Sequence, residues 1–129
     1  MSMTVTLIVE KTDTGFSAYS QDTAIFTTAQ TVPELINNSY EAANLYYEDE
    51  NVELGPGDIL FEIDFKQFFK YYKVLNAKFL AEKIGMNATL LSQYVQGHKK
   101  PSSKQTKKIL NGINQIGQEL SGINLLQPA

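Results

Sequence analysis

The sequence lacks cysteine and arginine, and each absence excludes a kind of chemistry. Without cysteine there is no disulfide, no zinc–thiolate site and no thiol nucleophile, which fits a reducing compartment. Without arginine, guanine cannot be read by a bidentate guanidinium, so base reading must come from Asn, Gln, Ser, Thr or Lys. The single histidine, His98, has no second His or Cys to complete a metal site. We therefore expect no metal and no other cofactor.

Long apolar runs are missing as well. The opening residues MSMTVTLIVE have no basic segment and only a short apolar run, so we expect no signal peptide. No stretch approaches the length of a membrane span. With 129 residues, of which 43% are apolar and 19% charged, the chain is predicted to be a globular cytoplasmic protein of one ordinary domain or two small ones.

Charge is divided by position along the chain. Residues 1–65 hold one lysine against twelve acidic residues, a balance of −11, whereas residues 66–129 hold ten lysines against two, a balance of +8. The formal total of −3 conceals this division. Such asymmetry indicates a nucleic-acid-binding half. The acidic half suits a basic partner, because opposite potentials steer association.

The first 65 residues are predicted to fold as β-β-β-α-β. Strands are expected at 4–10, 16–20, 24–29 and 59–64, the first three joined by tight turns. A helix should begin at the capping box Thr31-Val32-Pro33-Glu34 and return by a right-handed crossover, which makes the fourth strand parallel to its neighbour. The spacing of its small and apolar residues predicts one buried helix face, consisting of Val32, Leu35, Ile36, Ser39, Ala42, Ala43 and Tyr46.

The second half is predicted to be all helical, which makes the chain α+β. Helices are expected at about 65–72, 77–84, 88–96 and 103–120, with Asp64 capping the first of them. The segment 80–102, LAEKIGMNATLLSQYVQGHKKPS, places a glycine between two short amphipathic helices, as a helix-turn-helix requires. Gly, a basic loop and Pro-Ser follow the second helix. Over residues 66–120 this pattern resembles the phage-repressor-like helix-turn-helix family.

That resemblance implies that residues 88–96 form a recognition helix that binds DNA. Lysines around it would contact phosphates, which position a protein on DNA without specifying sequence, whereas Asn, Gln, Ser and Thr can bond base edges. The structural alternative is a helical bundle with a solvated lysine surface. The candidate DNA-binding residues are Lys78, Asn87, Thr89, Leu90, Ser92, Gln93, Gln96, Lys99, Lys100 and Lys104.

The first half looks like the HicB antitoxin family. The likeness covers about residues 4–65 and is carried by Glu10-Lys11, then Asp13-x-Gly15-Phe16-Ser17-Ala18-Tyr19, then Asp22, and then Thr31-Val32-Pro33-Glu34-Leu35. It implies a partial RNase H-like domain at 1–65 that masks a small basic ribonuclease toxin, HicA. A DNA-binding domain at 66–120 that represses the operon and a tail at 121–129 would follow. The chain would then be a type II antitoxin.

Two alternatives and the oligomeric state stay open. The chain could be a free-standing transcription regulator with a sensing front domain, or a metal-dependent nuclease that uses carboxylates such as Glu10, Glu62 and Asp64 with Glu41 and Glu48. We disfavour the nuclease, because no aspartate lies mid-strand in the first strand, and expect no enzyme. DNA binding by one small module favours a homodimer. The stripe Ile109, Ile113, Ile116 and Leu120 is a candidate dimer contact, and the alternative is that it packs within its own domain.

Overall fold

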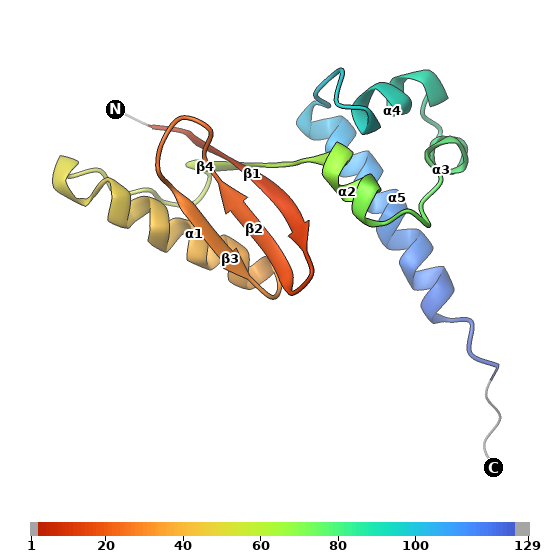
Figure 1. Cartoon of the computed structure of the whole chain (residues 1–129), viewed down its shortest axis with the longest axis horizontal. Helices are drawn as coiled ribbons and strands as arrows, with labels where there is room; N and C mark the ends of the chain where they lie inside the picture. Colours follow the sequence, from red (N-terminus) through yellow and green to blue (C-terminus); the bar gives the residue numbers. More distant parts are fainter. Residues whose placement is uncertain (1–2, 126–129) are drawn as a thin grey trace, which may run out of the picture. The chain divides into compact units, whose positions relative to one another are not determined.

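The computed structural model describes residues 3–125, and the predicted α+β fold is confirmed. The chain divides into two compact units, Met1–Tyr71 and Tyr72–Ala129. None of the described helices is long and apolar enough to cross a membrane. In chain order (Figure 1) the elements are β1 (Val5–Thr12), β2 (Gly15–Tyr19), β3 (Phe26–Ala29), α1 (Val32–Tyr46), the short 3-10 helix η1 (Glu48–Glu50), β4 (Ile59–Ile63), α2 (Phe65–Tyr71), α3 (Ala77–Ile84), α4 (Ala88–Val95) and α5 (Ser103–Ser121).

The first unit is a four-stranded sheet with α1 packed on one face. The strand order is β3-β2-β1-β4, in which β1 and β2 pair antiparallel, as do β2 and β3, while β4 is parallel to β1. The parallel pairing confirms the expected placement of the fourth strand. Side chains alternate along β1, so Val5 and Leu7 point into the core beneath α1. The buried core comprises Val5, Leu7, Ala18, Ile25, Leu35, Ala43, Leu54 and Ile59.

Gly15 is required where β3 ends against the first hairpin. It pairs with Thr12 across a turn of two residues and has φ of +155°. A side chain at this position would collide with the carbonyl oxygen of Ala29, and its Cβ would lie 2.6 Å from the Cα of Gln30. Backbone atoms cannot yield as a side chain can, so only glycine fits.

The predicted buried face of α1 is wrong at three positions. The helix begins as expected at Thr31, whose Oγ1 accepts a hydrogen bond from the backbone N–H of Glu34 at 3.3 Å. Leu35, Ser39 and Ala43 are buried, but Val32, Ile36 and Tyr46 are exposed. Small side chains at two of the buried positions let the helix approach the narrow sheet closely. The covered stripe is therefore a single i, i+4, i+8 row, rather than the wide face that periodicity predicts.

Side-chain contacts attach α2 to the first unit. The side-chain amide of Gln67 accepts from the backbone N–H of Lys11 at 2.9 Å and donates to its carbonyl oxygen at 2.6 Å. The Tyr71 hydroxyl bonds Asp13 at 3.2 Å, and Asp64 caps the helix, as predicted, by accepting from the N–H of Gln67. The division between units thus follows Tyr71, whereas the sequence placed it after residue 65. With α2 included, the first unit holds three lysines against twelve acidic residues, a balance of −9, and the second holds eight against two, a balance of +6.

The second unit is built from α3, α4 and α5. Its buried side chains are Leu80 and Ala81 of α3, Leu91 and Tyr94 of α4, Ile109 of α5, and Met86 from the turn between α3 and α4. Gly112 of α5 lies directly against Ile84 and Leu80 of α3. The expected bounds of all three helices agree with the structure to within one residue. In the expected tail, Ser121 still belongs to α5, and residues 126–129 lie outside the described part of the chain.

Candidate nucleic-acid interface

A three-residue turn, Gly85 to Asn87, joins α3 to α4. Gly85 is left-handed with φ of +69°. Its N–H donates to the carbonyl of Glu82, and the N–H of Met86 donates to the carbonyl of Ala81 at 2.9 Å. These two bonds form a Schellman motif, which satisfies the last carbonyls of α3 and turns the chain sharply. The buried Met86 side chain completes the motif. The turn therefore has the geometry that a helix-turn-helix needs.

Asn87 performs a structural role that differs from the base contact expected of it. Its Oδ1 accepts hydrogen bonds from the backbone N–H groups of Thr89 at 2.8 Å and Leu90 at 3.1 Å, so it caps the N-terminus of α4. Bidentate pairing of asparagine with adenine uses both its oxygen and its amide nitrogen. Asn87 cannot make that pair while its oxygen holds the cap, and only the amide nitrogen remains to donate. The capping preference of Asn could have predicted this.

The exposed face of α4 brings together four of the predicted residues. Thr89, Ser92, Gln93 and Gln96 are spaced i, i+3, i+4 and i+7, which places them on one side of the helix. Thr89 and Gln96 are exposed, while Ser92 and Gln93 are half-buried. The Gln96 side chain donates to the Ser92 hydroxyl at 3.2 Å, so these two act as a pair. Leu90 is half-buried and offers only apolar contact. The opposite side of α4 buries Leu91 and Tyr94 in the core.

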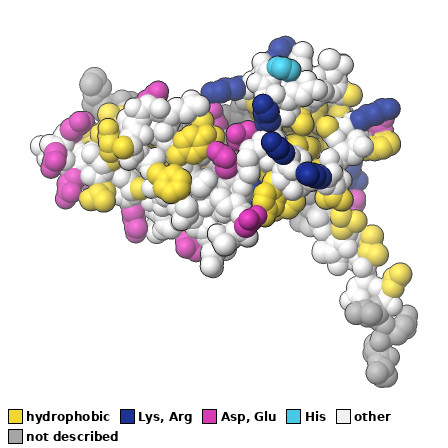
Figure 2. Space-filling model, in the orientation of Figure 1, with side chains coloured by type: hydrophobic (Ala, Val, Ile, Leu, Met, Phe, Trp, Pro, Cys, Tyr) yellow, Lys and Arg dark blue, Asp and Glu magenta, His cyan; other side chains and the backbone are white. Residues whose placement is uncertain are grey.

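The loop after α4 is basic and held by main-chain bonds. The N–H groups of His98 and Lys99 both donate to the carbonyl of Gln93, at 2.9 and 3.3 Å, and Gly97 has φ of +81°. Ser102 then caps α5 by accepting from the N–H of Gln105 at 3.1 Å. The predicted phosphate contacts Lys78, Lys99, Lys100 and Lys104 are all exposed. Figure 2 shows lysine side chains on the surface close to His98.

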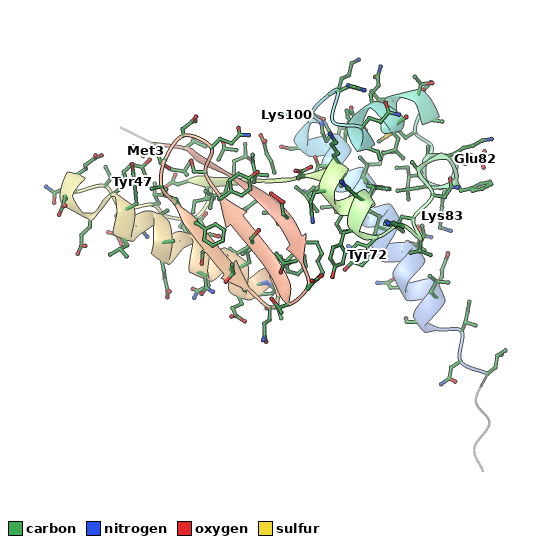
Figure 3. The ribbon with its side chains drawn as sticks, viewed as in Figure 1. Met3, Tyr47, Tyr72, Glu82, Lys83 and Lys100 are labelled. Atoms are coloured by element: carbon green, nitrogen blue, oxygen red, sulfur yellow. The ribbon has the colours of Figure 1, made fainter. Side chains whose placement is uncertain are left out.

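Two other lysines are used inside the second unit. Lys83 forms an ion pair with Glu119 at 3.0 Å, which joins α3 to α5. The Lys108 ammonium donates to the carbonyl of Gly85 at 3.4 Å, where it also compensates the negative end of the α3 dipole. Figure 3 labels Lys83 on α3 beside Glu82, and Lys100 in the loop before α5. Lys107, by contrast, is exposed on α5 between Lys104 and Lys108, so it is a candidate phosphate contact that sequence reasoning missed.

The carboxylates considered for a nuclease are divided between the open face of the sheet and the helix that covers its other face. Glu10 on β1 and Glu62 on β4 project from the sheet face opposite α1, because they alternate with the core residues of their strands. Glu41 is exposed on α1, which covers the other face. Within residues 3–125 no group of three or more His, Asp or Glu side chains could hold a metal ion.

One ionisable group in the first unit is perturbed. Burial raises the pKa of the Tyr19 hydroxyl above its ordinary value. The charge of Glu10, a hydrogen bond with that carboxylate and the charge of Asp64 raise it further. These three side chains therefore lie close together on the open face of the sheet.

Comparison with known proteins does not extend the motif resemblances. No protein-family model, no curated protein and no solved structure matches the chain. The likeness to the helix-turn-helix family therefore depends on residues 80–102, and the likeness to the HicB family on residues 10–35. Both stay predictions.

Proposed function

We propose that the chain is the antitoxin of a type II toxin–antitoxin pair that acts in the cytoplasm without enzymatic activity. Its second unit binds operator DNA and represses the operon, and its first unit neutralises a basic, HicA-like mRNA-cleaving toxin by binding it directly. One observation carries the DNA-binding part. A helix-turn-helix corner closed by a Schellman motif exposes the polar face of α4 in a unit whose balance is +6.

The polar residues and the lysines have different roles in this proposal. Thr89, Ser92, Gln93 and Gln96 face away from the core and bond base edges, which gives sequence preference. The lysines at positions 78, 99, 100 and 104 bind phosphates, which supplies affinity. The chain works as a homodimer, since one small module reads only a half-site.

The DNA-binding proposal predicts a steep salt dependence. If each subunit of a dimer neutralises about 3–4 phosphates, the logarithm of affinity should fall with the logarithm of salt concentration with a slope of roughly −6. Fluorescence anisotropy with a duplex from upstream of its own gene, and with a scrambled duplex, measures this. Replacing Lys99 and Lys100 with Ala should weaken both duplexes alike, whereas Gln93→Ala should reduce the preference between them.

Matched lysines control for charge alone. Lys66 and Lys70 are exposed on α2, outside the proposed surface, and replacing both with Ala lowers the charge by the same amount. That control should bind DNA nearly as the wild type does. A flat salt response, or equal losses from the control and from the Lys99/Lys100 pair, would contradict DNA binding through this surface.

The toxin-binding part is supported by the balance of −9 on the first unit. A cationic ribonuclease is attracted to such a surface, and complementary charge speeds association more than it adds affinity. Co-expression with the product of the neighbouring gene tests this. We expect the two proteins to co-purify and growth to be rescued. DNA binding without co-purification would favour the free-standing regulator instead.

A further inference from the structure

We infer that two copies of this chain associate through the C-terminal half of α5, with the two helices antiparallel. The inference rests on the proposed function, in which the dimer pairs two recognition helices on DNA. It names the surface and the arrangement that the proposed dimer uses.

The apolar stripe of α5 continues beyond the core of its own unit. Ile109, Ile113, Ile116 and Leu120 are separated by 4, 3 and 4 residues, which is the spacing of a coiled-coil seam, and Ile123 follows just after α5 ends at Ser121. Ile109 is fully buried, but Leu120 is 62% exposed and Ile123 is 66% exposed. Ile113 and Ile116, between them, are half-buried. The seam thus begins in the core and ends uncovered at Leu120, and the exposed Ile123 lies just beyond the end of the helix.

Charge favours a second copy of this unit as the partner that covers the stripe. A unit with a balance of +6 repels its copy everywhere that lysines are exposed. No lysine follows Lys108, and Glu119 is the one charged residue after it in the sequence. Glu119 is already paired with Lys83 at 3.0 Å. The C-terminal half of α5 is therefore the part of the unit where two copies can meet with least repulsion.

The same charges set the direction of pairing. Parallel helices would bring Lys104, Lys107 and Lys108 of both copies side by side, whereas antiparallel helices put them at opposite ends. Within α5 the centre of the seam from Ile113 to Leu120 lies between residues 116 and 117. Lys108, which contacts the helix-turn-helix corner at Gly85, lies about 8.5 residues away. At 1.5 Å per residue, the two corners would be roughly 25 Å apart along the axis.

The first test measures self-association. Sedimentation velocity of the full chain over a wide concentration range should show a dimer for the wild type. Leu120→Glu places a carboxylate in the seam and should raise the dimer dissociation constant by more than about tenfold. Gln118→Glu adds the same charge on the opposite side of α5 and should leave that constant within about threefold of wild type, as expected for a surface change.

Circular dichroism checks that both variants fold. A wild type that stays monomeric, or a Leu120→Glu variant that dimerises as the wild type does, would overturn the inference.

The second test measures direction, and the absence of cysteine makes it simple. A Lys107→Cys variant carries one spin label per chain, and the distance between the two labels is measured by pulsed electron paramagnetic resonance. Antiparallel pairing about the midpoint between residues 116 and 117 predicts roughly 28 Å along the axis. Parallel pairing predicts little more than the interaxial distance of about 8–10 Å plus the two label arms. A short distance would refute the antiparallel arrangement.

These outcomes are independent of the proposed function. A dimer that dissociates on Leu120→Glu but never binds DNA would support the inference and sink the DNA-binding proposal. A wild type that binds DNA with a steep salt slope while remaining monomeric would overturn the inference and support the DNA-binding proposal.

Discussion

Two glycines in α5 make a matched pair that isolates one steric contact. A Cβ at Gly112 would collide with Cγ2 of Ile84 and lie 3.4 Å from Cδ1 of Leu80, whereas a Cβ at Gly117 would meet nothing within 4 Å. Replacing either with Ala gains the helix propensity that glycine lacks, about 1 kcal/mol. Only Gly112→Ala adds a methyl group against a packed neighbour, which costs about 1–3 kcal/mol. Ile84 cannot turn aside easily, since β-branched side chains in helices keep one χ1 rotamer.

The difference between the two variants should therefore equal the overpacking cost alone. We expect Gly117→Ala to be more stable than wild type, and Gly112→Ala to be less stable than Gly117→Ala by about 1–3 kcal/mol. For a unit of this size that is a difference in melting temperature of at least about 4 °C. Urea and thermal unfolding followed by circular dichroism, at one protein concentration because self-association would add stability, measure it. Equal stabilities would show that α3 and α5 are not in close contact at Gly112.

Two further predictions concern the cap of α4 and the perturbed hydroxyl of Tyr19. Asn87→Ala removes the cap of α4 and should cost about 1 kcal/mol of stability, whereas Asn87→Asp keeps the capping oxygen and should cost less. Urea unfolding measures both losses, and equal losses would contradict the cap. Because the pKa of Tyr19 is higher in the folded state, its contribution to stability is present below about pH 10 and lost as the pH rises through the folded pKa. Glu10→Gln should lower that pKa in an NMR titration of ¹³C-labelled tyrosine, and an unchanged pKa would show that Glu10 does not act on the hydroxyl.

The helix ends of the second unit could be predicted from sequence because each is encoded by local chemistry. Asn76, Asn87 and Ser102 each cap the helix that follows with a side-chain oxygen, and Gly85 ends α3 in a left-handed conformation. Such signals act over three or four residues, so the sequence alone contains them. The parallel placement of β4 was predictable for a different reason, since a helix that carries the chain back across the sheet lets the next strand run parallel.

Long-range contacts account for what the sequence did not predict. The attachment of α2 to the first unit depends on Gln67 bonding both backbone groups of Lys11, fifty-six positions earlier. No local pattern distinguishes that glutamine from a solvent-exposed one. The exposure of Val32, Ile36 and Tyr46 on α1 was missed for the same reason. Periodicity predicts which helix face is apolar, but it does not predict how much of that face the sheet covers. Both errors are about which surfaces meet, and neither changes the type of any element.

The placement of charge within the helices argues against a merely solvated surface. Helix dipoles favour acidic residues at the N-terminal end and basic ones at the C-terminal end, by about 0.3–1 kcal/mol each. In α5 the first turn holds no acidic residue, and Lys104 and Lys107 both lie in the N-terminal half. The exposed Glu48, Asp49 and Glu50 follow directly after the C-terminal end of α1. Charges that served only solubility could be exchanged between these ends with a gain in stability. Their unfavourable positions are better explained if each cluster binds a partner of opposite charge, which is the division of labour that the proposed antitoxin requires.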